Sequence, residues 1–359
     1  MLSPVPAYWY ETHAHFSPRV TFYLWHGLAS STQKSYSTSQ KSYNDFVRLR
    51  PNLLESPGQY LPATSFAILE WIASLGDRAL QPKTIKSYRA SLRSLHVDAG
   101  LPFENCESPT VQRLIRGIKR FYEEQSRQPK LPITLSILQQ LVGLSGDCSI
   151  ISNAIIDAAE KVAWAGFLRC EEFTIGDKDK FDPAVHLTRA CVDFLPSFAN
   201  PTHVRLTLPA SKTDPFRKGV TILIAAVPGQ PTCAVAALKQ LFTIYPLSPS
   251  APLFADANGN PLTCSHFIST LKSRLATLGF DSSLYSGHSF RRGAATSAAS
   301  AGYSDYELQL LGQWRSDAYK LYIDIPRDRV LHLSARLHVA AAPAQPFKPP
   351  SLPFAPRLA

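Results

Sequence analysis

The sequence has little charge, one methionine and no long apolar run. Only 18% of its 359 residues are charged and 45% are hydrophobic, which excludes extended disorder for most of the chain. No stretch of about 18 apolar residues is present, so we expect no membrane span. The opening residues, MLSPVPAYWYETHAHF, lack a basic segment followed by an apolar run, so we expect no secretory signal. The length predicts about two domains.

Closely spaced cysteine pairs are also missing. The chain has 6 cysteines and no CxxC pair. Their wide, irregular spacing is not typical of a zinc site or of a disulfide scaffold. We therefore expect buried, reduced thiols in an intracellular protein, with no metal site and no cofactor.

Basic residues and proline are in excess. The 37 Lys and Arg residues outnumber the 27 Asp and Glu residues, which gives a net charge of +10 and indicates a polyanionic partner. Many of the 29 prolines lie near the end of the chain, in AAAPAQPFKPPSLPFAPRLA. This composition predicts an extended or disordered tail over residues 336–359.

Helical periodicity dominates the first third of the chain. We expect residues 1–28 to be irregular, because Pro4, Pro6 and Pro18 interrupt any regular element. Helices are predicted over residues 30–49, 63–75, 82–99 and 109–125. The proline-containing stretch SRQPKLPIT (126–134) is typical of a linker. The predicted boundaries are an N-terminal segment 1–28, a helical domain 29–128, a second domain 129–335 and the tail 336–359.

Two of these helices carry basic stripes separate from their apolar faces. The residues predicted to contact phosphates are Lys86, Arg89 and Arg93 on the first, and Arg113, Arg116, Lys119 and Arg120 on the second. Tyr122 is expected in the core. Acidic partners four residues away are largely missing, so ion pairs within each helix do not account for the stripes. Solvated helix faces are the simpler interpretation, and contacts to phosphates are the alternative that we favour.

The second domain mixes helices with a few strands. Helices are predicted over residues 136–144, 153–167, 232–244, 263–279, 288–301, 304–311 and 315–323, and strands over 185–194, 203–208 and 219–226. The last two strands alternate as in a hairpin, whose turn, PASKTDPFRK, contains Lys212. The predicted fold class is mainly α with a small β-sheet (α+β).

The stretch GHSFRRGAATSAASAGYSDYELQLLGQWRSDAYKLYI (287–323) holds the residues that could carry chemistry. His288 and Arg291 are three residues apart, which places them on one face of a helix. Tyr322 follows a break at Gly312. The GHSF sequence invites comparison with a hydrolase nucleophile elbow, but Arg291 stands where that motif needs a second glycine, so this interpretation fails.

Several separated motifs together resemble those of the tyrosine recombinase (phage integrase-like) family. The matching segments are GFLRCEE with Arg169 and Glu172, SKTD with Lys212, GHSFRR with His288 and Arg291, and LGQW with Gln313 nine residues before Tyr322. The N-terminal helices resemble the SAM-like core-binding domain of that family. The segment LGQWRSDAYKLYI is similar to eukaryotic Crypton and DIRS-type element recombinases.

The resemblance implies an enzyme that breaks and rejoins double-stranded DNA through a 3′-phosphotyrosyl intermediate. Such chemistry needs an activated oxygen, a stabiliser of negative charge and a proton donor. Tyr322 would be the nucleophile, Arg169 and Arg291 would hold the phosphate oxygens, and Lys212 would protonate the leaving 5′-oxygen. His288 would assist proton transfer or hold the phosphate, and Glu172 would support the local geometry. The family also implies a tetramer on DNA, a mobile element and, for the eukaryotic members, a nuclear location.

Some alternatives remain open. Gln313 stands where the family most often has His or Trp; its amide can donate a hydrogen bond but carries no charge. Tyr319 is a second tyrosine near the end, but the nine-residue spacing favours Tyr322 as nucleophile. The protein could also be a catalytically weak or inactive domesticated recombinase that only binds DNA. A type IB topoisomerase-like enzyme shares the chemistry, but the SAM-like helices argue against it.

Overall fold

The computed structural model describes residues 5–56, 58–122, 130–209, 219–314, 316–323, 330–331 and 334–335. Lys212 and the Pro-rich tail lie outside these residues. The chain divides into two compact units, residues 1–127 and 128–359, and each is described by itself. Within the described residues, no helix combines the length and apolar character that crossing a membrane requires.

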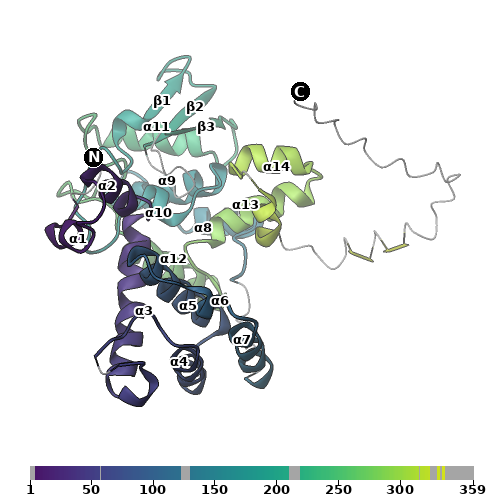
Figure 1. Ribbon diagram of the computed structural model, residues 1–359. Coiled ribbons are helices and arrows are strands. Elements are labelled where there is room, and N and C mark those ends of the chain that lie inside the picture. The colour runs from purple at the N-terminus through teal and green to yellow at the C-terminus, as the bar shows by residue number, and fades with distance from the viewer. Residues whose placement is uncertain are drawn as a thin grey trace, which may run out of the picture. The chain divides into compact units, whose positions relative to one another are not determined.

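The first unit consists of helices (Figure 1). They are α1 (Ala7–Thr12), α2 (Pro18–His26), α3 (Ser30–Arg48), the short 3₁₀ turn η1 (Pro51–Leu53), α4 (Ser65–Asp77), α5 (Pro82–Asp98), α6 (Glu104–Glu107) and α7 (Pro109–Phe121). Helices α3, α4, α5 and α7 enclose one core, in which Tyr43, Trp71, Ile85 and Ile115 are buried. Tyr122, expected in this core, is instead 41% exposed just after the end of α7.

The expectation of an irregular segment over residues 1–28 is wrong, because α1 and α2 lie within it. Pro18 does not interrupt α2 but begins it, at a position where the backbone N–H would have no helical partner. The Ser17 hydroxyl accepts a hydrogen bond from the backbone N of Val20 and caps the helix. The two helices are joined by the Trp9 indole, whose Nε1 donates to the carbonyl of Thr21 at 3.1 Å.

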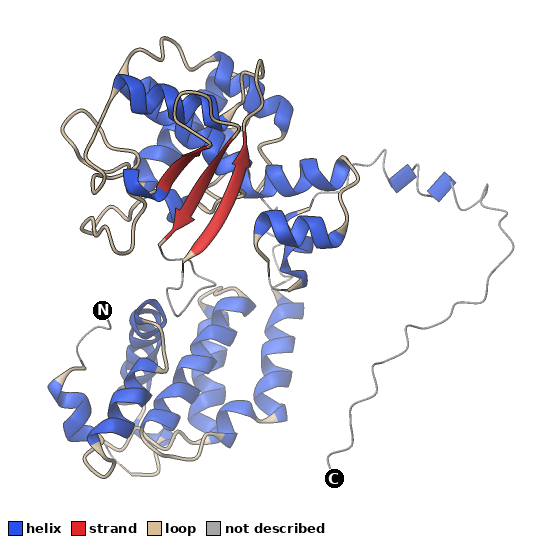
Figure 2. Ribbon diagram, turned by 90° about the horizontal axis from the view of Figure 1, so that it is seen from above, coloured by secondary structure: helices blue, strands red, loops and turns tan. Residues whose placement is uncertain are grey.

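The second unit combines helices with a small sheet. Its elements are α8 (Leu135–Gly143), α9 (Ile151–Ala165), α10 (Cys170–Phe173), η2 (Arg189–Cys191), β1 (Val192–Leu195), β2 (His203–Leu208), β3 (Val220–Ala225), α11 (Ala234–Ile244), α12 (Cys264–Thr277), η3 (Ser282–Leu284), α13 (Ser289–Ser300), α14 (Asp305–Gly312) and η4 (Asp317–Tyr322). Figure 2 shows the three strands side by side as one antiparallel sheet in the order β1-β2-β3. The predicted mainly α fold with a small sheet is confirmed.

The first strand is shorter than predicted. Only Val192–Leu195 pairs with β2, whereas a strand over residues 185–194 was expected. The backbone before this strand forms hydrogen bonds outside the sheet: the Leu187 carbonyl accepts from the Leu253 N–H, and the Arg189 N–H donates to the Ala251 carbonyl. The hairpin of β2 and β3 agrees with its prediction, and its last pair before the Lys212 turn is Leu208 with Val220.

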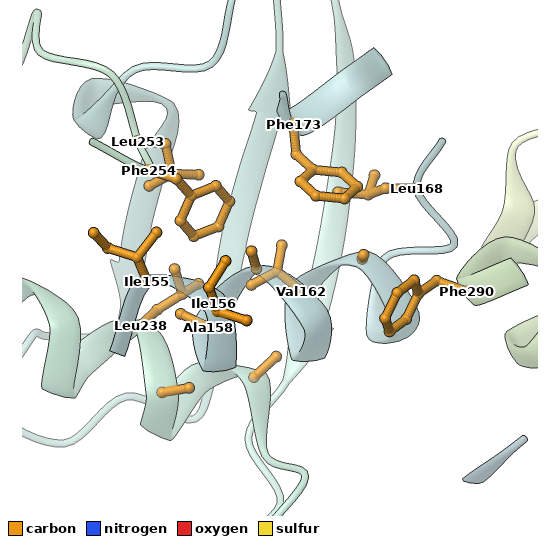
Figure 3. Close-up of a cluster of buried hydrophobic side chains, with 14 of the residues drawn as sticks. Ile155, Ile156, Ala158, Val162, Leu168, Phe173, Leu238, Leu253, Phe254 and Phe290 are labelled. Carbon is orange, nitrogen blue, oxygen red and sulfur yellow. The ribbon is translucent and has the colours of Figure 1, made fainter. Parts of the chain in front are cut away.

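Helix α9 lies at the centre of the second core and is buried from Ala154 to Ala163. Figure 3 shows its side chains Ile155 and Val162 among residues from other elements, including Phe254 and Phe290. Phe290 belongs to α13, which also approaches residue 133 closely: a Cβ at Gly293 would lie 1.7 Å from the Ile133 carbonyl oxygen. The absence of a side chain at position 293 therefore lets α13, the helix that carries Arg291, pack tightly against this core.

Candidate active site

Arg169 and Glu172 form a buried ion pair just after the end of α9. Gly166 ends α9, Phe167 adopts a left-handed backbone with φ 52°, and Arg169 then caps the short helix α10. One Glu172 carboxylate oxygen accepts from the Arg169 guanidinium at 2.7 Å, and the other accepts from the Arg169 backbone N at 2.8 Å. The two side chains are only 12% and 6% exposed. Glu172 therefore fixes both the backbone and the side chain of Arg169.

Arg291 lies almost completely inside the protein, with 3% of its surface exposed. Its Nη1 donates to the Phe167 carbonyl, and its Nη2 donates to the Gly312 carbonyl at 2.5 Å. Burial, and then the positive charge of Arg169, lower the pKa of Arg291 to about 10, so the guanidinium is still protonated at neutral pH. Part of the Arg291 guanidinium is therefore already hydrogen-bonded to backbone carbonyls of two other chain segments.

Tyr322 lies beside this arginine at the end of η4. Its ring centre is 5.7 Å from the Arg291 Cζ. Two residues of α13 hold the backbone of this turn: Thr296 Oγ1 donates to the Tyr322 carbonyl at 3.2 Å, and Arg292 Nη1 donates to the Leu321 carbonyl at 3.1 Å. Tyr319 is 1% exposed and packs in the core, whereas Tyr322 is only partly buried. The structure therefore favours Tyr322 over Tyr319 as a reactive hydroxyl.

His288 and Arg291 differ more than their helical spacing suggested. His288 is the N-cap of α13 and is exposed, whereas Arg291 is buried in the first turn. The preceding Gly287 packs closely on Cys170, and a Cβ at that glycine would lie 2.7 Å from the Cys170 Cβ. Since Cys170 directly follows Arg169, this contact brings the His288 segment next to the Arg169 segment.

Gln313 ends α14 in a left-handed conformation, with φ 54° and ψ 40°. The residue after it, Trp314, is 7% exposed, and its ring centre lies 4.2 Å from the Arg291 Cζ. The Trp314 ring also lies 5.5 Å from the Tyr322 ring. Sequence reasoning missed Trp314, although the aromatic in LGQW stands directly beside the position that the motif singles out.

The structure thus brings Arg169, Glu172, Arg291, Tyr322 and the Gln313–Trp314 pair into one region. Lys212 lies outside the described residues, so its place in the site stays a prediction. In the described part of the chain, no three His, Cys, Asp or Glu side chains are grouped so that they could hold a metal ion. The charges of the site come from arginines, with Glu172 as the partner of one of them.

Known proteins share this fold and part of this sequence. No family model matches the chain. An integrase/recombinase XerD homolog from Selenomonas ruminantium is 25% identical over 280 residues, which cover 76% of this chain and 74% of the relative. The XerH site-specific recombinase bound to palindromic difH substrate has a similar fold, with a TM-score of 0.56 and 11% identity over 85% of this chain and 79% of that one. The Tn1549 transposon integrase in complex with transposon right end DNA gives a TM-score of 0.53 and 14% identity over 92% of this chain and 98% of that one.

In sequence and in fold, the chain is similar to proteins of the tyrosine recombinase family.

The first unit of the chain has a basic groove between α5 and α7. The groove has a volume of about 450 Å³, and its charged lining residues are Lys86, Arg89, Arg116 and Lys119. The two predicted stripes therefore meet along a common groove.

The other predicted DNA contacts lie elsewhere or are differently placed. Arg93 pairs with Glu107 at 2.8 Å and lies 4.3 Å from the centre of the Phe103 ring. Arg93 therefore has an acidic partner that comes from α6 rather than from its own helix. Arg113 and Arg120 are exposed on α7 outside the groove lining.

Replacing Glu172 with Ala should destabilise the second unit by about 3 kcal/mol, because it leaves the largely buried Arg169 guanidinium without its carboxylate. The neighbouring Glu171 is exposed, and Glu171→Ala should change stability by no more than about 0.5 kcal/mol. Urea unfolding of the two variants measures the difference. Equal stability of both variants would show that the Arg169–Glu172 pair does not hold this segment.

Proposed function

We propose that this protein is a site-specific DNA recombinase that breaks and rejoins double-stranded DNA through a 3′-phosphotyrosyl intermediate. The observation that carries the proposal is the position of Tyr322, whose ring lies 5.7 Å from the Cζ of a buried, protonated arginine, Arg291. A phenol oxygen beside fixed cations is suited to attack a phosphodiester, because the cations attract the phosphate and stabilise the charge that develops on it.

In the proposed reaction, the Tyr322 hydroxyl attacks the scissile phosphorus. A phosphorus–oxygen bond to Tyr322 forms as the phenol proton passes to His288 or to water, the bond to the 5′-oxygen breaks, and the leaving oxygen takes a proton from Lys212. Arg169 and Arg291 stabilise the charge on the non-bridging oxygens. His288, exposed at the start of α13, assists proton transfer or holds the phosphate. The same steps in reverse, with a new 5′-hydroxyl, rejoin the strand without ATP.

Two chain segments would divide the work. Residues 29–128 would form the core-binding domain, with the groove of Lys86, Arg89, Arg116 and Lys119 following the DNA backbone. Residues 129–335 would form the catalytic domain. Two observations support this division: the chain forms two compact units, and Arg169, Arg291 and Tyr322 all lie in the second unit.

The assembly and setting of the reaction are further proposals. We propose that the protein acts as a homo-oligomer, a tetramer on paired DNA sites. A nuclear location and a mobile-element origin rest on the likeness of LGQWRSDAYKLYI to Crypton and DIRS-type recombinases alone.

Tyr322→Phe should abolish covalent protein–DNA adducts on a nicked suicide duplex and leave DNA affinity unchanged, because only the attacking hydroxyl is removed. Tyr319→Phe is the matched control: it removes the hydroxyl of the buried tyrosine three residues earlier and should still form the adduct. Denaturing gels that separate adduct from free DNA measure both. Adducts formed by the Tyr322→Phe variant would contradict the assignment, and DNA binding by the wild type without any adduct would favour the inactive DNA-binding alternative.

The basic groove should contribute to DNA affinity through counterion release. Joint replacement of Lys86 and Arg116 with Ala should make the slope of log K against log salt less steep by about 2. Replacing Arg19 and Lys34 removes the same charge from positions of the same unit outside the groove and should leave the slope unchanged. Fluorescence anisotropy titrations at several salt concentrations give both slopes. If the two double variants behave alike, the affinity reflects net charge rather than the groove.

A further inference from the structure

The Arg291 guanidinium has partners on some of its sides only. A guanidinium has five N–H groups in one plane. In Arg291, one Nη1 hydrogen is directed to the Phe167 carbonyl and one Nη2 hydrogen to the Gly312 carbonyl. The Nε atom is buried and has no hydrogen-bond partner among the described residues. Leaving a buried charged donor without an acceptor is costly, so this edge is prepared for an acceptor that arrives with a ligand.

An aromatic side chain, Trp314, lies against the same guanidinium. The Trp314 ring centre is 4.2 Å from the Arg291 Cζ, and a cation over an aromatic face is attracted to it. The ring is held in turn by Phe167, edge-on at 6.1 Å, and by Tyr322 at 5.5 Å. This contact supplies no hydrogen-bond acceptor to the Nε–H group of Arg291, which stays without a partner among the described residues.

The local backbone fits the Trp314 ring closely. A Cβ at Gly312 would lie 1.6 Å from the Trp314 Cζ3, so only glycine fits beneath the ring. Gln313, between them, adopts a left-handed conformation that glycine and asparagine adopt more readily. Gly312 and the left-handed Gln313 together end α14 and allow the Trp314 ring to pack at this position.

We infer that Trp314 is a positioning residue, which holds Arg291 so that its unpartnered Nε edge is presented to the scissile phosphate. This inference rests on the proposed function and deepens it. The motif spacing singled out Gln313, but Trp314 is the residue that contacts both Arg291 and Tyr322. One indole thereby fixes the phosphate-binding arginine relative to the nucleophile.

Three variants separate positioning from simple packing. Trp314→Leu removes the aromatic face, Trp314→Phe keeps a smaller one, and Tyr319→Leu truncates another buried ring of the same cluster. Single-turnover cleavage of a suicide duplex is measured at saturating DNA, below the melting temperature of every variant. Trp314→Leu should slow cleavage about tenfold with unchanged DNA affinity, and Trp314→Phe should stay within about threefold of wild type. Tyr319→Leu should lower the melting temperature comparably and also stay within about threefold.

Cleavage by Trp314→Leu at the wild-type rate would overturn the inference, and so would equal losses in Trp314→Leu and Tyr319→Leu. A second measurement does not depend on cleavage. It is the NMR chemical shift of the Arg291 Nε–H proton, whose signal is assigned because it disappears in the Arg291→Lys variant. In the wild type, the ring current of Trp314 should shift this signal upfield relative to Trp314→Leu. An unchanged signal would overturn the inference.

Failure of the wild type to form adducts would instead refute the proposed function. The NMR signal would still decide whether Trp314 positions Arg291.

Discussion

The burial of one cation, the Arg291 guanidinium, is the constraint on which the site depends. A buried charge needs partners close by, because its loss of water is otherwise uncompensated. Arg291 finds them in the carbonyls of Phe167 and Gly312 and in the ring of Trp314. Residue 167 lies just before Arg169, and residue 312 lies just before the turn that ends in Tyr322. The hydrogen bonds and the ring contact of Arg291 therefore bring together three segments that are far apart in the sequence.

A second arginine is held in a different way. Arg169 has Glu172 as a close partner, whereas Arg291 has neutral carbonyls and an aromatic ring. The two cations repel each other, and this repulsion adds to burial in lowering the pKa of Arg291 to about 10. Arg291 remains protonated at neutral pH. The combined charge of the two arginines exceeds that of the single carboxylate, and this excess suits a site that receives a phosphate.

Periodicity and motif spacing predicted much of this from the sequence. Most helix positions after residue 28, the β2–β3 hairpin and the fold class belong to this group, because each depends on local patterns. The grouping of Tyr322 with Arg291 was expected from the family resemblance instead. Trp314 was missed because its contact with Arg291 depends on the left-handed turn at Gln313, which nothing in the residue type indicates.

Other misses have similar physical causes. The Arg93–Glu107 pair joins two helices, and helical spacing within one helix cannot reveal it. Residues 1–28 were expected to be irregular because proline was taken only as an interruption, although it also begins helices, as Pro18 does.

The central claim is that Arg291 holds the segment that carries Tyr322. Hydrogen–deuterium exchange in the Arg291→Lys variant tests it most directly, because a single ammonium cannot reproduce the planar guanidinium contacts to Phe167, Gly312 and Trp314. The account predicts faster exchange in peptides that cover residues 316–323, and unchanged exchange in β2. Wild-type exchange over residues 316–323 in the variant would contradict it.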